Sequence, residues 1–294
     1  MVALTPADAQ TSDADATVAV VTVSYASDEV LPAFLATIDD VHGRRPLIVV
    51  ADNKPDASIA QITGHAHARY LPLPENRGYG SAVNAAIASL PSSVRWVLIS
   101  NPDVTLGASA LATLVATAEE SDDIASVGPA VRTPEGDLYP SARRVPSIRL
   151  GVGHALFSGL WPTNPWSRRY RQEKDAYRRD AGWLSGSCLL VRRSAFEQIG
   201  GFDEGYFMYF EDVDLGYRFG LAGFRNVYQP AAEVTHVGGH ATRETSAAMI
   251  EAHHRSARRF VASKYRGPML APVRWALGVG IAVRSWLVRR RLDA

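Results

Sequence analysis

Apolar, β-branched runs alternate with amphipathic segments over the first half of the chain. Each run is long enough for a strand buried on both faces, and each following segment carries apolar residues at helical spacing. The predicted strands are residues 17–25, 46–53, 68–74, 94–101 and 124–131. The predicted helices are residues 28–40, 56–65, 81–90 and 106–120. This alternation predicts an α/β fold with a Rossmann-like, mostly parallel sheet flanked by helices.

The alternation is lost after residue 140. Residues 143–180 are rich in Arg, Trp, Pro and Gly, which is typical of a long basic loop or insertion. Further strands are predicted at 182–193, 224–229 and 232–237, and further helices at 194–200, 211–222 and 242–265. Residues 1–16 are mostly small and polar, and we expect a mobile N-terminal tail without the basic and apolar regions of a signal peptide.

Charge is divided unevenly along the 294-residue chain, although its formal net charge is +1. Residues 1–142 contain 7 Lys and Arg against 17 Asp and Glu, whereas residues 143–294 contain 24 against 13. This asymmetry predicts an anionic partner for the second half. No helix-turn-helix, zinc-finger or single-strand-binding signature is present, so we expect no nucleic acid and favour anionic lipid. The lone Cys188 excludes a disulfide framework and a cysteine metal site.

The C-terminal stretch 268–292 is apolar but interrupted by arginines. Its longest uncharged run, Trp275 to Val283, is far too short to span a membrane. We therefore predict a helix that lies on the surface of an anionic membrane. The alternative is a helix that packs on the rest of the protein or in a dimer interface.

Polar side chains follow three of the predicted strands. Tyr25, Asp52 with Asn53, and the run Asn101-Pro102-Asp103 all stand where parallel strands end, which is the edge at which such sheets bind ligands. Asp52 is placed to accept a hydrogen bond from a pyrimidine base. Asp103 suits a hard divalent cation such as Mg²⁺ or Mn²⁺ that also binds a diphosphate. Simple turn residues are the alternative in each case.

The segment ENRGYGSAVNAAI at 75–87 combines two glycines with a helix start. Gly78 and Gly80 would let the backbone approach a ligand, and the helix N-terminus would favour a phosphate. Arg77 would reach the base or a phosphate. A glycine turn before an ordinary helix is the alternative.

The segment FMYFEDVDLGYRF at 207–219 places three carboxylates among aromatic residues. Asp214 and Arg218 are spaced to pair on one helix face, which leaves Asp212 free to face a cleft as a general base. The direction of its pKa shift stays open, because burial and the helix dipole act in opposite directions. His236 follows a short strand and would complete a metal site with Asp103, or would simply be structural.

Seven segments in order are similar to the inverting glycosyltransferases of family 2, which have the GT-A fold. They are VTVSY (21–25), ADN (51–53), ENRGYGSAVN (75–84), SNPDV (100–104), WLSGSCLLVRR (183–193), GGFDEGYFMYFEDVDLGYR (200–218) and AEVTHVGG (232–239). The resemblance implies a GT-A catalytic domain at 17–240, with the basic insertion 143–180 near the acceptor and the membrane. A basic helical C-terminal extension at 241–294 follows.

The resemblance also implies roles for single residues. Asp212 would be the catalytic base, and Asp103 and His236 would bind a divalent metal, Mg²⁺ or Mn²⁺. The nucleotide site would comprise Val23, Tyr25, Asp52, Asn53, Arg77, Gly80, Asn84, Asn101 and Pro102. The sugar and acceptor cleft would comprise Trp183, Ser185, Gly186 and Glu211. Asn101 stands where the family's metal-binding motif has its first acid.

Three further segments look like the actinobacterial rhamnosyltransferases of arabinogalactan linker synthesis. They are YPSAR (139–143), NPWSRRYRQE (164–173) and GWLSGSCLLVRRSAF (182–196). This implies transfer of L-rhamnose from dTDP-L-rhamnose to the 3-hydroxyl of GlcNAc in polyprenyl-diphosphate-GlcNAc, at the cytoplasmic face of the plasma membrane. A homo-oligomer is a further expectation. The alternatives are another donor, such as UDP-galactofuranose, or a non-catalytic, membrane-associated sugar-nucleotide-binding protein.

Overall fold

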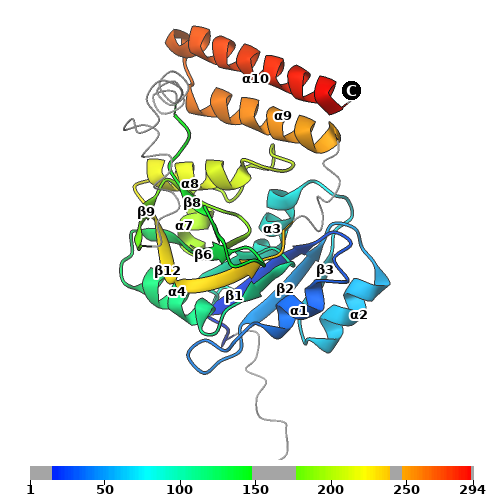
Figure 1. The fold of residues 1–294 in the computed structure, drawn as a ribbon. Coiled ribbons are helices and arrows are strands. Elements are labelled where there is room, and N and C mark those ends of the chain that lie inside the picture. Colours follow the sequence, from blue (N-terminus) through cyan, green and yellow to red (C-terminus); the bar gives the residue numbers. More distant parts are fainter. Residues whose placement is uncertain (1–14, 148–176, 239–246, 293–294) are drawn as a thin grey trace, which may run out of the picture.

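The computed structural model describes residues 15–147, 177–238 and 247–292, and Figure 1 shows their arrangement. The main sheet has the order β3-β2-β1-β4-β11-β6-β12-β5. These strands are β1 (Val18–Ser24), β2 (Leu47–Asp52), β3 (Arg69–Pro72), β4 (Trp96–Ser100), β5 (Val104–Leu106), β6 (Ile124–Arg132), β11 (Cys188–Arg192) and β12 (Arg225–His236). Four short strands are β7 (Leu138–Tyr139) beside β6, β9 (Arg179–Ala181) beside β12, and the pair β8 (Ala142–Arg143) and β10 (Trp183–Leu184).

The predicted mostly parallel sheet is confirmed, with one late strand inserted in the opposite direction. The strands β3, β2, β1 and β4 run parallel, and β6 pairs with β12 in parallel. The strand β11 lies between β4 and β6 and is antiparallel to both. Because β11 comes from residues far along the chain, it brings the second half of the sequence into the centre of the sheet.

Helices cover both faces of the sheet, and each face has its own core. The helices α1 (Leu31–Ala36), α2 (Ala57–His65) and α4 (Ala110–Glu119) pack on one face. The helices α3 (Tyr79–Ala88), α7 (Arg193–Gln198) and α8 (Glu211–Leu221) pack on the other. Alternate residues of β1 serve the two cores, since Val18 and Val20 face one and Ala19 and Val21 the other.

Three sequence-based boundaries are wrong. Residues 104–106 form β5, so the helix predicted at 106–120 begins only at Ala110. The strand predicted at 182–193 is divided into β10 and β11 by a turn. The two strands predicted at 224–229 and 232–237 are one strand, β12, with a register shift between Gln229 and Glu233. Pro230 lies in that shift, where a missing N–H is tolerated.

The C-terminal residues form a helical hairpin above α8 (Figure 1). It consists of α9 (Ala247–Lys264), the short η3 (Pro268–Leu270) and α10 (Ala271–Leu292). The helix α9 packs on α8 and the residue before it through Phe260, whose ring contacts those of Phe210 and Tyr217. None of the described helices is both long enough and apolar enough to cross a membrane.

Ion pairs connect the acidic and basic halves of the sequence. Arg178 and Arg225 reach the acids of the α4–β6 turn, Glu120 and Asp123, and Arg192 pairs with Asp122. Arg132 and Glu233 also pair across the halves, but each carries the minority charge of its own half. The charge asymmetry is therefore partly satisfied inside the molecule, and it points to an external anion less strongly than the sequence indicates. Most of the predicted basic insertion, residues 148–176, lies outside the described residues, as do residues 1–14 of the predicted tail.

Candidate active site

Asp52 ends β2 and organises the turn into α2. It is fully buried, and its carboxylate accepts hydrogen bonds from the N–H groups of Lys54 and Asp56 at 3.1 and 3.3 Å. The hydroxyl of Tyr70 donates a third bond at 3.1 Å. A carboxylate has about four lone-pair sites, so one site is left for another donor. The predicted contact with a nucleotide base stays a prediction.

Polar atoms without partners lie at the same edge of the sheet. Asn53 donates its N–H to the Ser24 carbonyl at 2.9 Å and its side-chain amide to the Gly78 carbonyl at 3.4 Å. The Asn53 Oδ1 and Ser24 Oγ atoms are buried without a hydrogen-bond partner among the described residues. Val23 is buried and Tyr25 is half exposed. Unpaired buried oxygens are unusual in folded proteins, so this edge is suited to a polar ligand.

Asp103 and His236 meet beyond the end of β4. The His236 Nε2 atom lies 3.1 Å from Asp103 Oδ1 and 3.4 Å from the side-chain amide nitrogen of Asn101. The predicted meeting of these two residues, 133 positions apart, is confirmed. The described residues contain no group of three or more His, Cys, Asp and Glu placed to hold a metal. One carboxylate and one imidazole fit a Mg²⁺ or Mn²⁺ ion that takes its other ligands from a diphosphate and water. Pro102, which lies between Asn101 and Asp103 in the sequence, is partly exposed.

The segment around α3 binds another loop of the protein. Asn84 donates its amide to the Phe202 carbonyl at 2.9 Å and to Glu204 at 3.3 Å, and it accepts the Phe202 N–H at 3.0 Å. A Cβ at Gly80 would lie 2.8 Å from the Phe202 Cβ. The exposed Arg77 pairs with Glu204 at 2.9 Å. Asn84 and Gly80 thus contact the 202–204 segment, and the nucleotide-binding roles predicted for them stay predictions.

Strained backbone leads into α8. Tyr209 and Phe210 have φ values of 67° and 66°, in the left-handed region that aromatic residues rarely adopt. Such strain persists only where surrounding contacts enforce it, and it is common at functional sites. Here Ser256 of α9 donates its hydroxyl to the Met208 carbonyl at 2.8 Å. The C-terminal hairpin therefore supports the segment that positions the first turn of α8.

Asp212 and Asp214 point in different directions from that turn, as predicted. Asp214 pairs with Arg218 at 2.6 Å and is almost fully buried. Asp212 Oδ2 instead accepts the N–H of Gly186 at 3.0 Å, and its Oδ1 accepts the N–H of Val213 at 2.8 Å. Burial raises the pKa of Asp212, although these two hydrogen bonds act in the opposite direction. The carboxylate is therefore more basic than an ordinary aspartate, which suits a general base.

Glu211 is a second carboxyl group in the same turn. It is 8% exposed, and its Oε2 atom has no hydrogen-bond partner among the described residues. Burial and the neighbouring charge of Asp212 raise the pKa of Glu211 to about 8. Burial and the charge of Asp212 thus favour the protonated form of Glu211.

The wall opposite α8 is formed by β8, β10 and the turn after β10. Trp183 donates its indole N–H to the Arg144 carbonyl at 3.1 Å, and the Arg143 guanidinium lies 5.7 Å from the Trp183 ring. Ser185 forms a hydrogen bond at 3.1 Å with Ser187. Three of the predicted acceptor residues, Trp183, Ser185 and Gly186, therefore lie in one segment beside Asp212.

Comparisons with known proteins decide the family. The model of a family described as "Glycosyltransferase like family 2" matches residues 15–258. The chain belongs to glycosyltransferase family 2. An N-acetylglucosaminyl-diphospho-decaprenol L-rhamnosyltransferase from Mycobacterium tuberculosis is 44% identical over 283 residues, which cover 92% of each chain. The Escherichia coli rhamnosyltransferase WbbL is 29% identical over 255 residues, or 83% of this chain and 92% of WbbL.

Solved structures confirm the GT-A fold of this glycosyltransferase. The Pyrobaculum calidifontis mannosyltransferase PcManGT, in complex with GDP-Man and Mn²⁺, matches with a TM-score of 0.58 at 15% identity. The match covers 94% of this chain and 75% of that one. GalNAc-T7 with UDP, GalNAc and Mn²⁺ matches with a TM-score of 0.54 at 16% identity, over 75% of this chain and 44% of that one.

Sequence reasoning missed Tyr79 in this glycosyltransferase. Its hydroxyl donates to the Gly186 carbonyl at 2.9 Å, while the Gly186 N–H donates to Asp212. The backbone N–H of Tyr79 donates to the Phe207 carbonyl at 3.1 Å. The only sequence signal is an aromatic residue between Gly78 and Gly80. At Gly78, φ is +101° and a Cβ would lie 2.2 Å from the Phe207 carbonyl oxygen, so only glycine fits.

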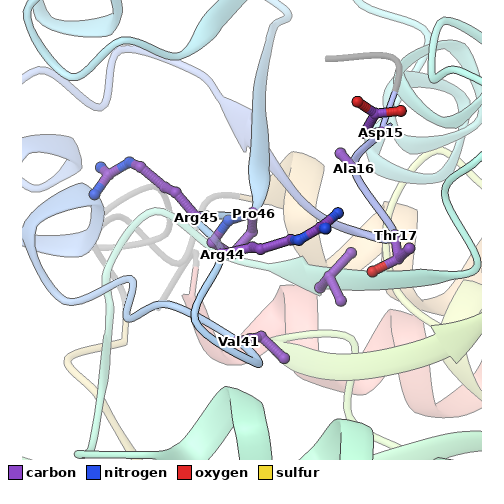
Figure 2. A pocket seen from close by; sticks show the side chains of 8 residues that line it. Asp15, Ala16, Thr17, Val41, Arg44, Arg45 and Pro46 are labelled. Atoms are coloured by element: carbon purple, nitrogen blue, oxygen red, sulfur yellow. The ribbon is translucent and has the colours of Figure 1, made fainter. Parts of the chain in front are cut away.

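A small pocket of the glycosyltransferase lies away from these residues. It is lined by residues 15–18, Val41 and residues 44–46 (Figure 2). These residues stand at the amino ends of β1 and β2, opposite the strand ends that carry the candidate site. Its space of about 10 Å³ suits a single water molecule, so it is not a substrate site.

Proposed function

We propose that this glycosyltransferase transfers L-rhamnose from dTDP-L-rhamnose to the 3-hydroxyl of GlcNAc in polyprenyl-diphosphate-GlcNAc, a step of cell-wall arabinogalactan linker synthesis. The observation that carries the proposal is 44% identity, over 92% of both chains, to a rhamnosyltransferase named for this acceptor type. The chain carries the chemistry that such a transfer needs, since Asp212 stands beside the wall made by Trp183 and Gly186.

In this proposal Asp212 removes the proton from the acceptor hydroxyl. The acceptor oxygen then attacks the anomeric carbon from the face opposite the nucleotide, and the configuration at that carbon is inverted. The C–O bond to the leaving diphosphate breaks in the same step, through an oxocarbenium-like state. The Gly186 N–H orients the Asp212 carboxylate, and burial keeps it basic enough to accept the proton.

Asp103 and His236 are the residues that would hold Mg²⁺ or Mn²⁺. The metal would supply positive charge for the diphosphate that leaves with the nucleotide. Asp52, Asn53 and the unpaired Ser24 Oγ form the polar edge where we place the nucleoside.

Turnover with purified protein tests the donor and the acceptor. Release of nucleoside diphosphate from dTDP-L-rhamnose should depend on a GlcNAc-diphosphate-lipid acceptor and on Mn²⁺ or Mg²⁺, and EDTA should abolish it. UDP-galactofuranose is the matched competing donor. Acceptor-dependent turnover with UDP-galactofuranose alone would retain the glycosyltransferase and overturn the rhamnose assignment.

We further propose that the enzyme works at the cytoplasmic face of the plasma membrane. Its hairpin exposes apolar side chains, of which Met269 is 92% and Trp275 is 73% exposed, together with Leu270 and Val279. Such residues beside arginines suit an anionic lipid surface. Truncation after Tyr265 removes α10 but retains α9, so the truncated enzyme should fold and release from anionic liposomes. If the full-length and truncated enzymes are retained equally on liposomes in low and high salt, the proposed membrane role of α10 is refuted. Whether the enzyme is a homo-oligomer stays a prediction.

A further inference from the structure

An apolar groove runs along the C-terminal part of α8. It has a volume of about 410 Å³, within the range of small-molecule sites. Its lining comprises Val145, residues 180–182, Gly216, Tyr217, Gly220, Leu221 and residues 224–226. Leu221, at the end of α8, is 69% exposed among the described residues.

The groove adjoins the wall that β8, β10 and the turn after β10 form opposite α8. Gly216 and Gly220 follow Asp212 at intervals of four residues, so they lie about 6 and 12 Å from it along the helix axis. Trp183 and the groove residues Val145 and Tyr217 pack against one cluster that contains Val213 and Phe260. The β8–β10 ladder therefore leads from Gly186, which donates to Asp212, past the Arg143–Trp183 pair to the groove residues Val145 and Gly182.

Cationic groups lie between the two ends of this path. The Arg143 guanidinium stands over the Trp183 ring and is close enough to lower the pKa of Asp212 by its charge. Lys264, at the end of α9, donates to the Pro146 carbonyl and lies 5.3 Å from the ring of Tyr217. The exposed apolar turn of the hairpin begins only a few residues beyond Lys264, on the same side of the molecule as β9 (Figure 1).

We propose that this groove binds the first isoprene units of the lipid acceptor, an inference that rests on the proposed function. A polyprenyl-diphosphate-sugar presents a polar sugar, an anionic diphosphate and an apolar chain in that order. The protein presents Asp212, then Arg143, then the groove in the same order. The rest of the chain would leave the groove past Lys264, toward the hairpin turn with Met269 and Leu270 that would meet the lipid surface.

Gly220 allows the groove to be filled without strain. Its φ is not in the left-handed region, and a Cβ there would meet no atom of the described residues within 4 Å. Leucine is also a better helix former than glycine. Gly220→Leu should therefore fold as well as the wild type. Leu221→Asp is a second variant, which places a charge at the lip of the groove. Gly64→Leu is the matched control, because Gly64 is also an exposed helical glycine with open space, but in α2.

The test compares two acceptors that share the GlcNAc-diphosphate head and carry one or four isoprene units. The wild type and Gly64→Leu should show kcat/KM higher by on the order of tenfold for the longer chain, because more apolar surface is buried. Gly220→Leu and Leu221→Asp should lose this preference and retain the kinetics of the short acceptor. Arg143→Gln should weaken both acceptors equally. The proposal that the groove binds isoprene units would be refuted in two cases. The preference for the longer chain persists in Gly220→Leu and Leu221→Asp, or the wild type shows no such preference.

Binding of farnesyl phosphate, followed by quenching of tryptophan fluorescence, separates this inference from the proposed function. The wild type and Gly64→Leu should bind this probe, and Gly220→Leu should bind it at least about tenfold more weakly. If no rhamnose is transferred but this binding difference is found, the proposed function is refuted and the proposed lipid-binding role of the groove is retained. If rhamnose transfer is found but farnesyl phosphate binds equally to all three proteins, the proposed lipid-binding role of the groove is refuted and the proposed function is retained.

Discussion

The donor side and the acceptor side of the candidate site are built in different ways. On the donor side, Asp52 and Asn53 extend directly from a buried strand, and Asp52 is held by bonds to residues two, four and eighteen positions away. On the acceptor side, Asp212 depends on Gly186, which in turn is held by Tyr79, 107 residues earlier in the chain. The strand-end residues of the donor side follow from local chain geometry, whereas the Asp103–His236 pair and the acceptor side need the tertiary fold.

The acceptor side also carries the strain and the unusual ionisation. The left-handed Tyr209 and Phe210 precede the first turn of α8, and Glu211 there has a pKa raised to about 8. α9 supports the strained segment through Ser256. We infer that the donor side would keep its geometry when the acceptor side is disturbed, and the predictions below test this difference.

The largest effect is expected for Asp212→Asn. The amide cannot take the proton from the acceptor, so kcat should fall on the order of 10³-fold. Donor binding should change little, because Asp212 is not on the donor side. Kinetics and isothermal titration with dTDP-L-rhamnose would measure the two properties. A kcat within a few fold of the wild type in a folded variant would refute the assignment of the base.

His236→Ala should affect the donor side instead. It removes one of two candidate metal ligands, so the Mn²⁺ concentration for half-maximal activity should rise by about 100-fold. The KM for the acceptor should stay the same. His65→Ala, at the exposed end of α2, is the control. Unchanged Mn²⁺ dependence in His236→Ala would remove His236 from the metal site.

Tyr79→Phe tests the connection between the two sides. Without its hydroxyl the Gly186 peptide is held less firmly, and its N–H stabilises the ionised Asp212 less. We expect kcat to fall roughly tenfold, and the acidic limb of the pH profile of kcat to move to higher pH. Tyr206→Phe is the control, since the buried Tyr206 hydroxyl has no hydrogen-bond partner among the described residues. If the acidic limb lies at the same pH in Tyr79→Phe and in the wild type, Tyr79 contributes only packing.

Glu211→Gln should change stability rather than chemistry. The pKa of Glu211 is about 8 in the folded protein against 4.5 for an ordinary glutamate, so between these values the unfolded chain releases a proton that the folded protein keeps. The wild type therefore loses stability as pH rises through this range. Glu211→Gln should be more stable than the wild type by roughly 1–3 kcal/mol at pH 8 and by much less at pH 5. Urea unfolding at both pH values measures this, and an equal difference at the two would contradict the burial argument.

The sequence predicts the strand-end residues of the donor side because the signals there are local. The strands β1, β2 and β4 are continuous apolar runs, and their polar tips follow at once. The pairing of Asp214 with Arg218 is also local, and the structure confirms it. The strand β5 was missed because three residues carry too little periodicity to compete with the helix that follows.

The rest of the site depends on contacts that no local pattern encodes. The contact of Asn84 and Gly80 with Phe202, more than a hundred residues away, is not visible in their glycine-rich turn. The contrast in charge between the two halves of the sequence suggested an external anion, and Arg192 and Arg225 show that part of it is internal. Only the three-dimensional fold distinguishes these possibilities.

The configuration of the product tests the central claim most directly. The wild-type enzyme would be incubated with dTDP-β-L-rhamnose and a GlcNAc-diphosphate-lipid acceptor, and the anomeric configuration of the transferred rhamnose determined by NMR. Direct displacement with Asp212 as the base predicts an α-rhamnoside linked to the 3-hydroxyl of GlcNAc. A β-rhamnoside would mean retention, and it would contradict the single-displacement role that we assign to Asp212.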